Sequence, residues 1–229
     1  MKGQQTIGIL GGMGPEATSE LFNRIIRKTP VKRDQDHINI VIINDPKIPD
    51  RTEYILGHGE NPIPKLIENL NKLKISGADI ALIPCMTAHS FFSELQKKSP
   101  IPIVNAIELV ESYLSNMPNI ERVGLLATRG TYKSRVFQKY LTKEVVVPME
   151  DDQKFLMEII YGPNGIKAGN TSREQLNKIK KIIERLDGIQ AVIAGCTELS
   201  LIMNGKYMKL PVIDPLSILA EHAIDLGIE

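Results

Sequence analysis

The chain has 229 residues, with 28 Lys and Arg against 27 Asp and Glu, so its formal net charge is +1. Without a basic stripe or an aromatic ladder, this balance argues against a nucleic-acid partner. The sequence contains neither an apolar run of about 18 residues nor a signal-peptide pattern, so we expect a cytoplasmic protein that does not contact a membrane.

The N-terminal segment predicts a strand, a tight turn and a helix. Residues 6–11 are apolar and lead into a Gly-Gly-Met-Gly turn, after which Pro15 suits the first position of a helix that runs to about residue 28. Gly12, Gly14 and Ala17 match a dinucleotide-binding pattern, but a lone match of this kind is weak. The simpler interpretation is a turn whose backbone amides face a small anion.

The next elements lead to the first cysteine. Residues 38–44 predict a strand, and a long Pro- and Gly-containing connection with Arg51 near its middle follows. Loops of this length at the carboxyl end of a sheet are often binding loops. An amphipathic helix over residues 64–76 then precedes a buried strand, residues 77–84, which ends at Cys85.

His89 lies four residues after Cys85, in a helix that we predict over residues 87–98. A cysteine and a histidine at this spacing could form a nucleophile and its base, as in a thiol hydrolase. The alternative is a histidine that packs against or hydrogen-bonds to its own helix, because one turn along the axis its ring does not point over the thiol.

The remaining sequence predicts further strands and helices in alternation. Strands are expected at residues 101–104, 122–127, 144–147, 189–194 and 210–213. Helices are expected at residues 105–116, 151–161 and 172–186, from the polar turn at 128–131 to about residue 141, in a short segment up to 203, and at 215–226. A second long loop, residues 162–171, carries Lys167. We expect the last helix to return and pack on the first half of the chain.

An internal repeat organises these elements. Residues 77–89 and 188–200 align without a gap, which puts the two cysteines, Cys85 and Cys196, in the same column. Two further pairs of similar segments occur in the same order and at nearly the same offset. We therefore predict two pseudo-symmetric α/β lobes, each a mainly parallel sheet flanked by helices. The first contains residues 1–105 and 215–229 and the second residues 106–214, with a site in the cleft between them.

The cysteine pair is the candidate catalytic centre. Cys85 and Cys196 lie in neither a C-x-x-C pattern nor a histidine cluster, which suits neither a disulfide scaffold nor a zinc site. Inversion of an amino acid's α-carbon needs a proton acceptor on one face and a donor on the other. Thiols on two lobes meet this demand, and we expect each to precede a helix N-terminus that favours the thiolate. The alternative is that both are inert buried cysteines.

Polar residues near the cysteines provide candidate substrate contacts. Thr87, Thr197 and the glycine turn could stabilise an α-carboxylate as the carbanion develops. A second carboxylate would need a cation, for which Arg51 offers a bidentate fork and Lys167 a point charge. No metal-ligating constellation is present, and this chemistry needs no pyridoxal phosphate, so we expect no cofactor.

Five segments carry a resemblance to a known family. They are Gly8-Ile-Leu-Gly-Gly-Met-Gly-Pro, Ile48-Pro-Asp-Arg-Thr, Pro84-Cys-Met-Thr-Ala-His, Gly165-Ile-Lys-Ala-Gly-Asn and Ala194-Gly-Cys-Thr-Glu. They resemble the aspartate/glutamate racemase family, and its aspartate racemases above all. The resemblance implies two flavodoxin-like lobes, a homodimer, and cofactor-independent racemisation of an acidic amino acid by the two cysteines. It also implies that Arg51 and Lys167 hold carboxylates and that Met13, Met86, Thr87 and Thr197 line the site.

Met86 departs from the family pattern, which has asparagine after the first cysteine. Methionine cannot replace the hydrogen bonds of an amide, so the substrate preference of this chain stays open. Besides the hydrolase, two alternatives remain: a related isomerase or decarboxylase of a small dicarboxylate, and a non-catalytic protein that binds an amino acid.

Overall fold

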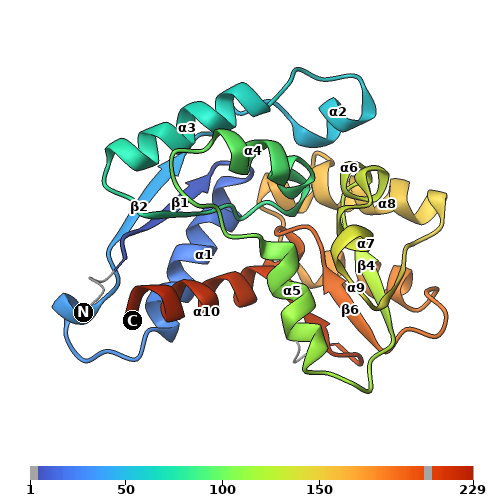
Figure 1. The fold of residues 1–229 in the computed structure, drawn as a ribbon. Coiled ribbons are helices and arrows are strands. Elements are labelled where there is room, and N and C mark those ends of the chain that lie inside the picture. Colours follow the sequence, from blue (N-terminus) through green and yellow to red (C-terminus); the bar gives the residue numbers. More distant parts are fainter. Residues whose placement is uncertain (1–4, 204–207, 229) are drawn as a thin grey trace.

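A computed structural model of the chain describes residues 5–203 and 208–228. Two parallel β-sheets form the centres of two lobes that lie side by side, and helices pack on both sheets (Figure 1). The predicted α/β fold with two lobes and mainly parallel sheets is confirmed.

The first sheet has the strand order β2-β1-β3, with parallel pairing throughout. Its strands are β1 (Ile7–Gly11), β2 (Ile40–Asn44) and β3 (Ile80–Leu82). Where the sequence predicts a fourth strand, the structure has an isolated bridge between Ala81 and Ile103. β1 is buried along its whole length, as expected for the middle strand of a parallel sheet that is covered on both faces.

The second sheet has the order β5-β4-β6-β7, again with parallel pairing. Its strands are β4 (Arg122–Leu126), β5 (Glu144–Val146), β6 (Ala191–Ala194) and β7 (Val212–Ile213). β4 lies between β5 and β6 just as β1 lies between β2 and β3. This common order matches the sequence repeat, in which β1 corresponds to β4 and β3 to β6.

Helices cover both sheets, and their ends follow from local sequence. In chain order the α-helices are α1 (Pro15–Lys28), α2 (Arg51–Leu56), α3 (Ile63–Ile75), α4 (Phe92–Lys98), α5 (Ala106–Ser115), α6 (Arg129–Ser134), α7 (Val136–Tyr140), α8 (Glu150–Tyr161), α9 (Arg173–Ile183) and α10 (Pro215–Ile228). Short 3₁₀ helices span Asp34–Asp36, Met86–Phe91, Ile166–Ala168 and Leu199–Leu201. Asp50 caps α2 and Asn105 caps α5, each accepting hydrogen bonds from two backbone amides.

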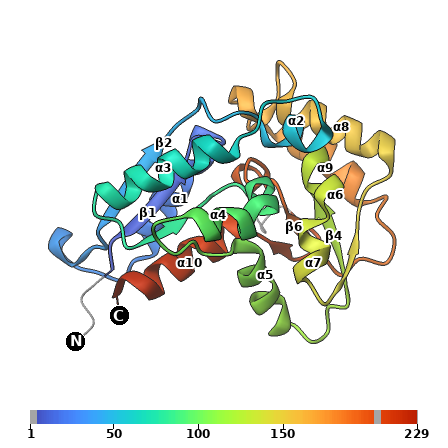
Figure 2. The ribbon, with the colours of Figure 1, turned by 45° about the horizontal axis from the view of Figure 1, so that its top comes forward.

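The last helix, α10, packs against α1 and α5, and both views place it along the first lobe (Figures 1 and 2). Arg24 of α1 forms an ion pair with Asp214, directly before α10, and donates hydrogen bonds to Ser217 and to the carbonyl of Ser200. Lys28 pairs with Glu221 farther along α10. The final segment thus returns to the first half of the chain, as the sequence predicts.

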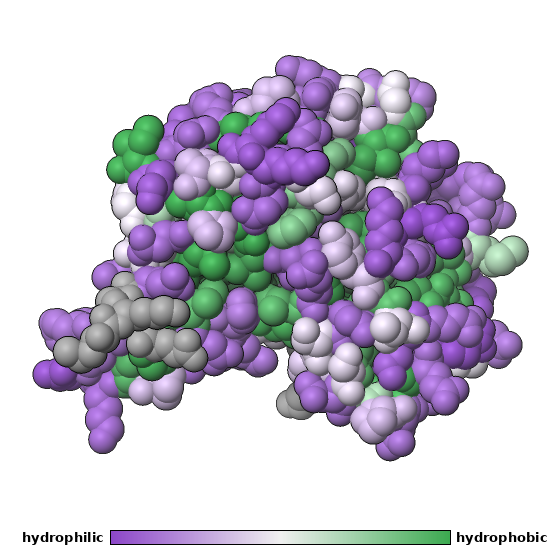
Figure 3. Space-filling view, viewed as in Figure 1, coloured by the Kyte–Doolittle hydropathy of each residue, from purple (hydrophilic) through white to green (hydrophobic). Residues whose placement is uncertain are grey.

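One apolar cluster runs through both lobes. It includes Ile9 of β1, Val123 of β4 and Leu219 of α10, so the sheets share a core where α10 and α5 bridge them. Figure 3 shows a mostly hydrophilic outer face on which apolar side chains lie between hydrophilic ones. Among the helices that the structure describes, none is long and apolar enough to cross a membrane.

Three predicted elements were wrong in detail. The connection after β2 contains α2, because Asp50 supplies a cap in a segment whose prolines indicated a loop. In place of the polar turn at 128–131 and one helix to about residue 141, the structure has the two short helices α6 and α7, separated at Arg135 by a left-handed backbone with φ of 54°. The helices expected directly after the cysteines begin as 3₁₀ turns.

Candidate active site

The glycine turn after β1 forms one wall of the site. Gly12 has φ of 96°, and a Cβ there would lie 2.3 Å from the backbone of Asp45 at the end of β2, so this position requires glycine. The amide of Gly12 donates to Thr18 Oγ1 at 3.0 Å, which fixes the turn on α1. Met13, at the tip, is buried and directs its carbonyl oxygen toward two cations described below.

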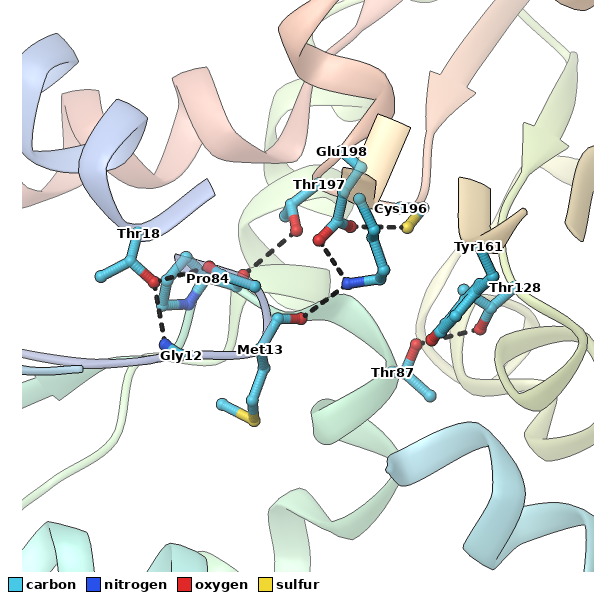
Figure 4. A network of polar contacts seen from close by, with 12 residues as sticks. Gly12, Met13, Thr18, Pro84, Thr87, Thr128, Tyr161, Cys196, Thr197 and Glu198 are labelled. Carbon is cyan, nitrogen blue, oxygen red and sulfur yellow. Dashed lines mark hydrogen bonds and ion pairs between the residues drawn. The ribbon is translucent and has the colours of Figure 1, made fainter. Parts of the chain in front are cut away.

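The two cysteines line one inner chamber between the lobes. Cys85 follows β3 and Cys196 follows β6, and each residue is 6% exposed. Thr197 Oγ1 donates to the carbonyl of Pro84 at 3.2 Å, which joins the two cysteine loops directly (Figure 4). The repeat thus places its equivalent thiols at one cavity, as predicted for the carboxyl ends of the strands.

The expected activation of both thiols by α-helix N-termini needs correction. Cys85 precedes the 3₁₀ helix Met86–Phe91, and Cys196 precedes the 3₁₀ helix Leu199–Leu201. These turns are short and tight, so they align fewer peptide dipoles than the α-helices that the argument assumed. At Cys196 the charge on the thiol is therefore governed by burial and by neighbouring side chains.

Cys196 lies against the carboxylate of Glu198. Its Sγ donates to Glu198 Oε2 at 2.9 Å, and Glu198 is only 3% exposed (Figure 4). Burial, followed by the negative charge of Glu198, raises the pKa of the Cys196 thiol well above its usual value. Lys167 opposes this effect but does not outweigh it. At neutral pH Cys196 is thus a protonated thiol, able to act as an acid.

Lys167 is held over the same carboxylate. Its Nζ donates to Glu198 Oε1 at 2.5 Å and approaches the carbonyl oxygen of Met13 at 3.5 Å. It also lies 5.2 Å from the centre of the Tyr161 ring. Burial alone would lower the pKa of Lys167, but Glu198 and the cysteines outweigh burial and raise it. Lys167 is therefore a charged group inside the site.

Arg51 carries a buried positive charge that no carboxylate neutralises by direct contact within the described chain. Its Nη atoms donate to the backbone carbonyls of Met13, Ile48 and Pro49, at 3.0 to 3.3 Å. Its Nε is buried without a hydrogen-bond partner. Burial opposes the charge, whereas Cys85 and Asp50 favour it strongly enough to raise the pKa of Arg51. An unpartnered donor on a buried cation is costly, and an anion would satisfy it.

Threonine hydroxyls join the two lobes beside Cys85. Thr87 Oγ1 lies 3.1 Å from Thr128 Oγ1 and 2.9 Å from Thr131 Oγ1, across the lobe boundary. Thr52 of α2 donates to Thr128 at 3.0 Å. Met86 lines the same chamber with an almost fully buried side chain and belongs to the shared apolar cluster. The wall beside Cys85 is thus hydroxyl-rich on one side and apolar on the other.

His89 turns away from the thiol. Its Nδ1 lies 3.0 Å from the carbonyl oxygen of Cys85, and its Nε2 accepts from the amide of Ala106 at 3.1 Å. Burial lowers the pKa of His89, so the ring stays neutral. Both nitrogens are occupied by the backbone, which supports the packing role and leaves Cys85 without a histidine base.

An outer cavity leads toward the inner chamber. The outer cavity measures about 330 Å³ and the inner chamber about 10 Å³, which is the space of a single water at most. Met13, Arg51, Tyr161, Lys167 and Glu198 line both. The Tyr161 hydroxyl donates to Asp50 Oδ2 at 3.2 Å, which links the second lobe to the first at this boundary. The inner chamber must widen before an amino acid can reach the thiols.

Comparison with known proteins agrees with this architecture. The family model described as Asp/Glu/Hydantoin racemase matches residues 10–223. The chain belongs to this family. It is 25% identical over 226 residues to the broad specificity amino-acid racemase RacX of Bacillus subtilis (strain 168), covering 95% of this chain and 96% of that protein.

Solved structures extend the comparison. Picrophilus torridus aspartate racemase matches with a TM-score of 0.85 and 30% identity, over 97% of this chain and 94% of that one. An aspartate racemase homologue from Pyrococcus horikoshii OT3 matches with a TM-score of 0.75 and 25% identity, over 98% and 100%. The resemblance noted in the sequence is confirmed, and the chain is an isomerase of the amino-acid racemase class.

The structure brings both cysteines and six candidate contacts to the inner chamber: Met13, Arg51, Met86, Thr87, Lys167 and Thr197. Of the glycine turn, Gly12 and Gly14 line the outer cavity instead. The structure adds Thr52, Thr128, Tyr161 and Glu198 to the wall of the inner chamber. Glu198 could have been predicted from the sequence, because a carboxylate two residues after a cysteine at a strand end can contact the thiol. Tyr161 was not, since an aromatic residue at a helix end is most often part of a core.

The contact between Glu198 and Cys196 gives a prediction about thiol reactivity. Glu198→Gln removes the negative charge that opposes the thiolate and leaves Lys167 to favour it, so the pKa of Cys196 should fall. At pH 8 the thiolate fraction then rises, and alkylation of Cys196 by iodoacetamide should become faster by about an order of magnitude. Peptide mass spectrometry measures this rate for Cys196 separately from Cys85.

The matched control is Glu174→Gln, which removes an exposed carboxylate from α9 of the same lobe. It should leave the rate of Cys196 alkylation unchanged. An equal rate in wild type and Glu198→Gln would mean that Glu198 does not set the protonation of this thiol.

Proposed function

We propose that the chain racemises an acidic amino acid, with aspartate as the first candidate, by a two-base mechanism that needs no cofactor. The observation that carries the proposal is that both thiols and the buried cation Arg51 line one chamber, the thiols contributed by different lobes. A thiol on each side can serve the two faces of an α-carbon, and the free Nε of Arg51 is suited to a substrate carboxylate.

The environments of the thiols suggest their roles in the resting enzyme. Glu198 keeps Cys196 protonated, whereas Cys85 shares the lining of the chamber with the cation Arg51. Cys85 therefore takes the α-proton of one enantiomer, and Cys196 delivers its own proton to the opposite face. Turnover of the other enantiomer starts from the reverse arrangement, with a thiolate on Cys196 that Lys167 stabilises.

The remaining polar groups are assigned to the two carboxylates of the substrate. The hydroxyl group of Thr87 and the backbone amides of the cysteine loops suit the α-carboxylate, on which negative charge grows as the proton leaves. Arg51 and Lys167 suit the side-chain carboxylate. The chamber is smaller than an amino acid, so it must open before substrate binds. Opening requires that the hydrogen bond between Tyr161 and Asp50 breaks, and that Lys167 gives up part or all of its ion pair with Glu198 to the substrate.

Incubation with L-aspartate and with L-glutamate in heavy water tests the proposal. Deuterium should enter the α-position together with loss of optical rotation, without added cofactor and in the presence of a chelator. Ligand-induced thermal stabilisation without deuterium entry would instead identify a non-catalytic binder. Loss of carboxylate as carbon dioxide would identify a decarboxylase.

Met86 favours a broader substrate range than aspartate alone. Its thioether offers an apolar wall beside Cys85 where an asparagine would offer a donor and an acceptor. Met86→Asn should raise kcat/KM for aspartate by about tenfold, since one hydrogen bond to a charged group is worth roughly 1.5–3 kcal/mol. The measurement compares aspartate, glutamate and methionine as substrates of both proteins.

The matched control for this change is Met157→Asn, because Met157 lies outside the chamber, on α8. That variant should keep the specificity of the wild type. No gain for either acidic substrate in Met86→Asn would mean that Thr87 or a water molecule already provides the contact. A homodimer, which the resemblance implies, stays a prediction that analytical ultracentrifugation would check.

A further inference from the structure

A cavity on the second lobe is separate from the chamber of the cysteines. It measures about 530 Å³, within the range of small-molecule sites. Arg129, Lys133 and Arg135 line it, and we call it the basic cavity. Within residues 5–203 and 208–228, the side chains of these three residues make no ion pair, whereas Lys154 of α8 and Lys178 of α9 each pair with a glutamate of their own helix. Three cations around one hollow, against the single carboxylate of Glu150 on the same lining, favour an anion.

Two of the cations lie on the exposed side of α6, and the buried side of that helix contacts the first lobe. Arg129 and Lys133 are exposed and one turn apart on α6, so they face the same direction. Gly130 of the same helix touches Thr52 so closely that a Cβ would lie 2.7 Å from its Cα, and Thr131 hydrogen-bonds to Thr87. The cationic face of α6 therefore has no part in joining the lobes and is free to bind a ligand.

Arg135 occupies a strained position at the rim. Its φ of 54° and ψ of 32° place its backbone in the left-handed region, which residues other than glycine and asparagine rarely adopt. This kink ends α6 and starts α7, and it brings a third cation to the cavity that Arg129 and Lys133 line. Strained positions of this kind are concentrated at functional sites.

The other lining groups narrow the class of anion. Gln138 lines the cavity, and its side-chain oxygen is buried without a hydrogen-bond partner, so it lacks a donor. Glu150 adds a second acceptor on the same lining. Leu56, Val145 and Val147 supply apolar surface. A ligand that satisfies this lining has an anionic group, hydrogen-bond donors and an apolar body.

We propose that the basic cavity binds a nucleoside monophosphate. The phosphate contacts Arg129, Lys133 and Arg135, because arginine and lysine donate charge-assisted hydrogen bonds to phosphate oxygens. The ribose hydroxyls or an exocyclic amino group donate to Gln138 and Glu150. The base lies against Val145 of β5, against Val147 directly after that strand, and against Leu56 of the first lobe.

Isothermal titration calorimetry of the full chain with AMP, GMP, CMP and UMP tests the proposal, with adenosine and inorganic phosphate as separate arms. At least one nucleotide should bind saturably below about a millimolar, and more tightly than either part alone. The double variant Arg129→Gln/Lys133→Gln should bind it at least about tenfold more weakly, because both phosphate contacts are lost. Both side chains are exposed, so the melting temperature should not change.

The control is Lys178→Gln/Lys181→Gln, which removes the same charge from α9, away from the cavity. It should leave the affinity unchanged. Absence of binding, equal binding of inorganic phosphate alone, or unchanged affinity in the double variant would overturn the proposal. Calorimetry does not require racemisation, and Cys85→Ala should bind the nucleotide as wild type does, so failure here is distinguishable from failure of the proposed racemase activity.

Discussion

Replacing either Cys85 or Cys196 with alanine is expected to stop racemisation of both enantiomers. Each thiol serves one face of the α-carbon, so each variant lacks either the acceptor or the donor of the proton for both directions of turnover. A positioned acid or base contributes about 10²- to 10⁴-fold, so kcat/KM should fall by at least this factor. Polarimetry from the L and the D enantiomer measures the loss.

Exchange of the α-proton distinguishes this prediction from simple damage to the site. A variant that keeps one thiol can still remove and return the proton on one face, so it should exchange deuterium into one enantiomer without inverting it. Because the two enantiomers have equal free energy, kcat/KM must fall by the same factor for the L and for the D enantiomer. Normal racemisation by Cys196→Ala would contradict the two-base mechanism and favour a reaction that needs only Cys85.

The sequence repeat was sufficient to predict the architecture around these thiols. Two copies of one pattern imply two sheets of the same strand order, and parallel strands deliver the residues that follow them to the same edge. The positions of Cys85 and Cys196 follow from that rule alone. The structure agrees, with β3 and β6 in equivalent places and a hydrogen bond between the cysteine loops.

The chemical asymmetry of the thiols could not be predicted in the same way. A repeat makes the two halves look alike, whereas Glu198 has no carboxylate counterpart after Cys85, because Thr87 stands at the equivalent place of the gap-free alignment. The contacts of Glu198 with Lys167 depend on a loop 31 residues away. Such contacts depend on tertiary structure, and local sequence does not encode them.

The type of helix that follows each cysteine was predicted wrongly from the sequence. Apolar and polar residues at helical spacing predict a helix over residues 87–98, and the pattern cannot distinguish an α-helix from a 3₁₀ turn that precedes one. Residues 87–91 of this segment belong to the 3₁₀ helix Met86–Phe91, in which His89 Nδ1 lies 3.0 Å from the carbonyl oxygen of Cys85. At Cys196, the electrostatic role assigned to a helix N-terminus passes instead to Glu198 and Lys167.

Arg51→Ala is expected to reduce kcat/KM for aspartate by more than about tenfold, and far more than for alanine. Arg51 is the buried cation beside Cys85, and its loss removes a charge-assisted contact worth on the order of 2 kcal/mol. If the same cation also stabilises the Cys85 thiolate, the activity toward alanine falls by a smaller factor. Steady-state kinetics with both amino acids separates the two contributions.

Arg51 also has a structural role that the experiment must separate. It donates to the carbonyls of Met13, Ile48 and Pro49, so Arg51→Ala removes three hydrogen bonds, of whose acceptors Met13 keeps Lys167, and should lower the melting temperature. Arg51→Lys keeps the charge but loses the fork and the Nε donor. It should therefore retain more activity toward alanine than toward aspartate.

The control is Arg33→Ala, an exposed arginine paired with Asp36, which should leave both activities unchanged. Equal losses for aspartate and alanine in Arg51→Ala would mean that Arg51 acts on the thiolate or on the α-carboxylate, and that Lys167 is the group to test for recognition of the side-chain carboxylate.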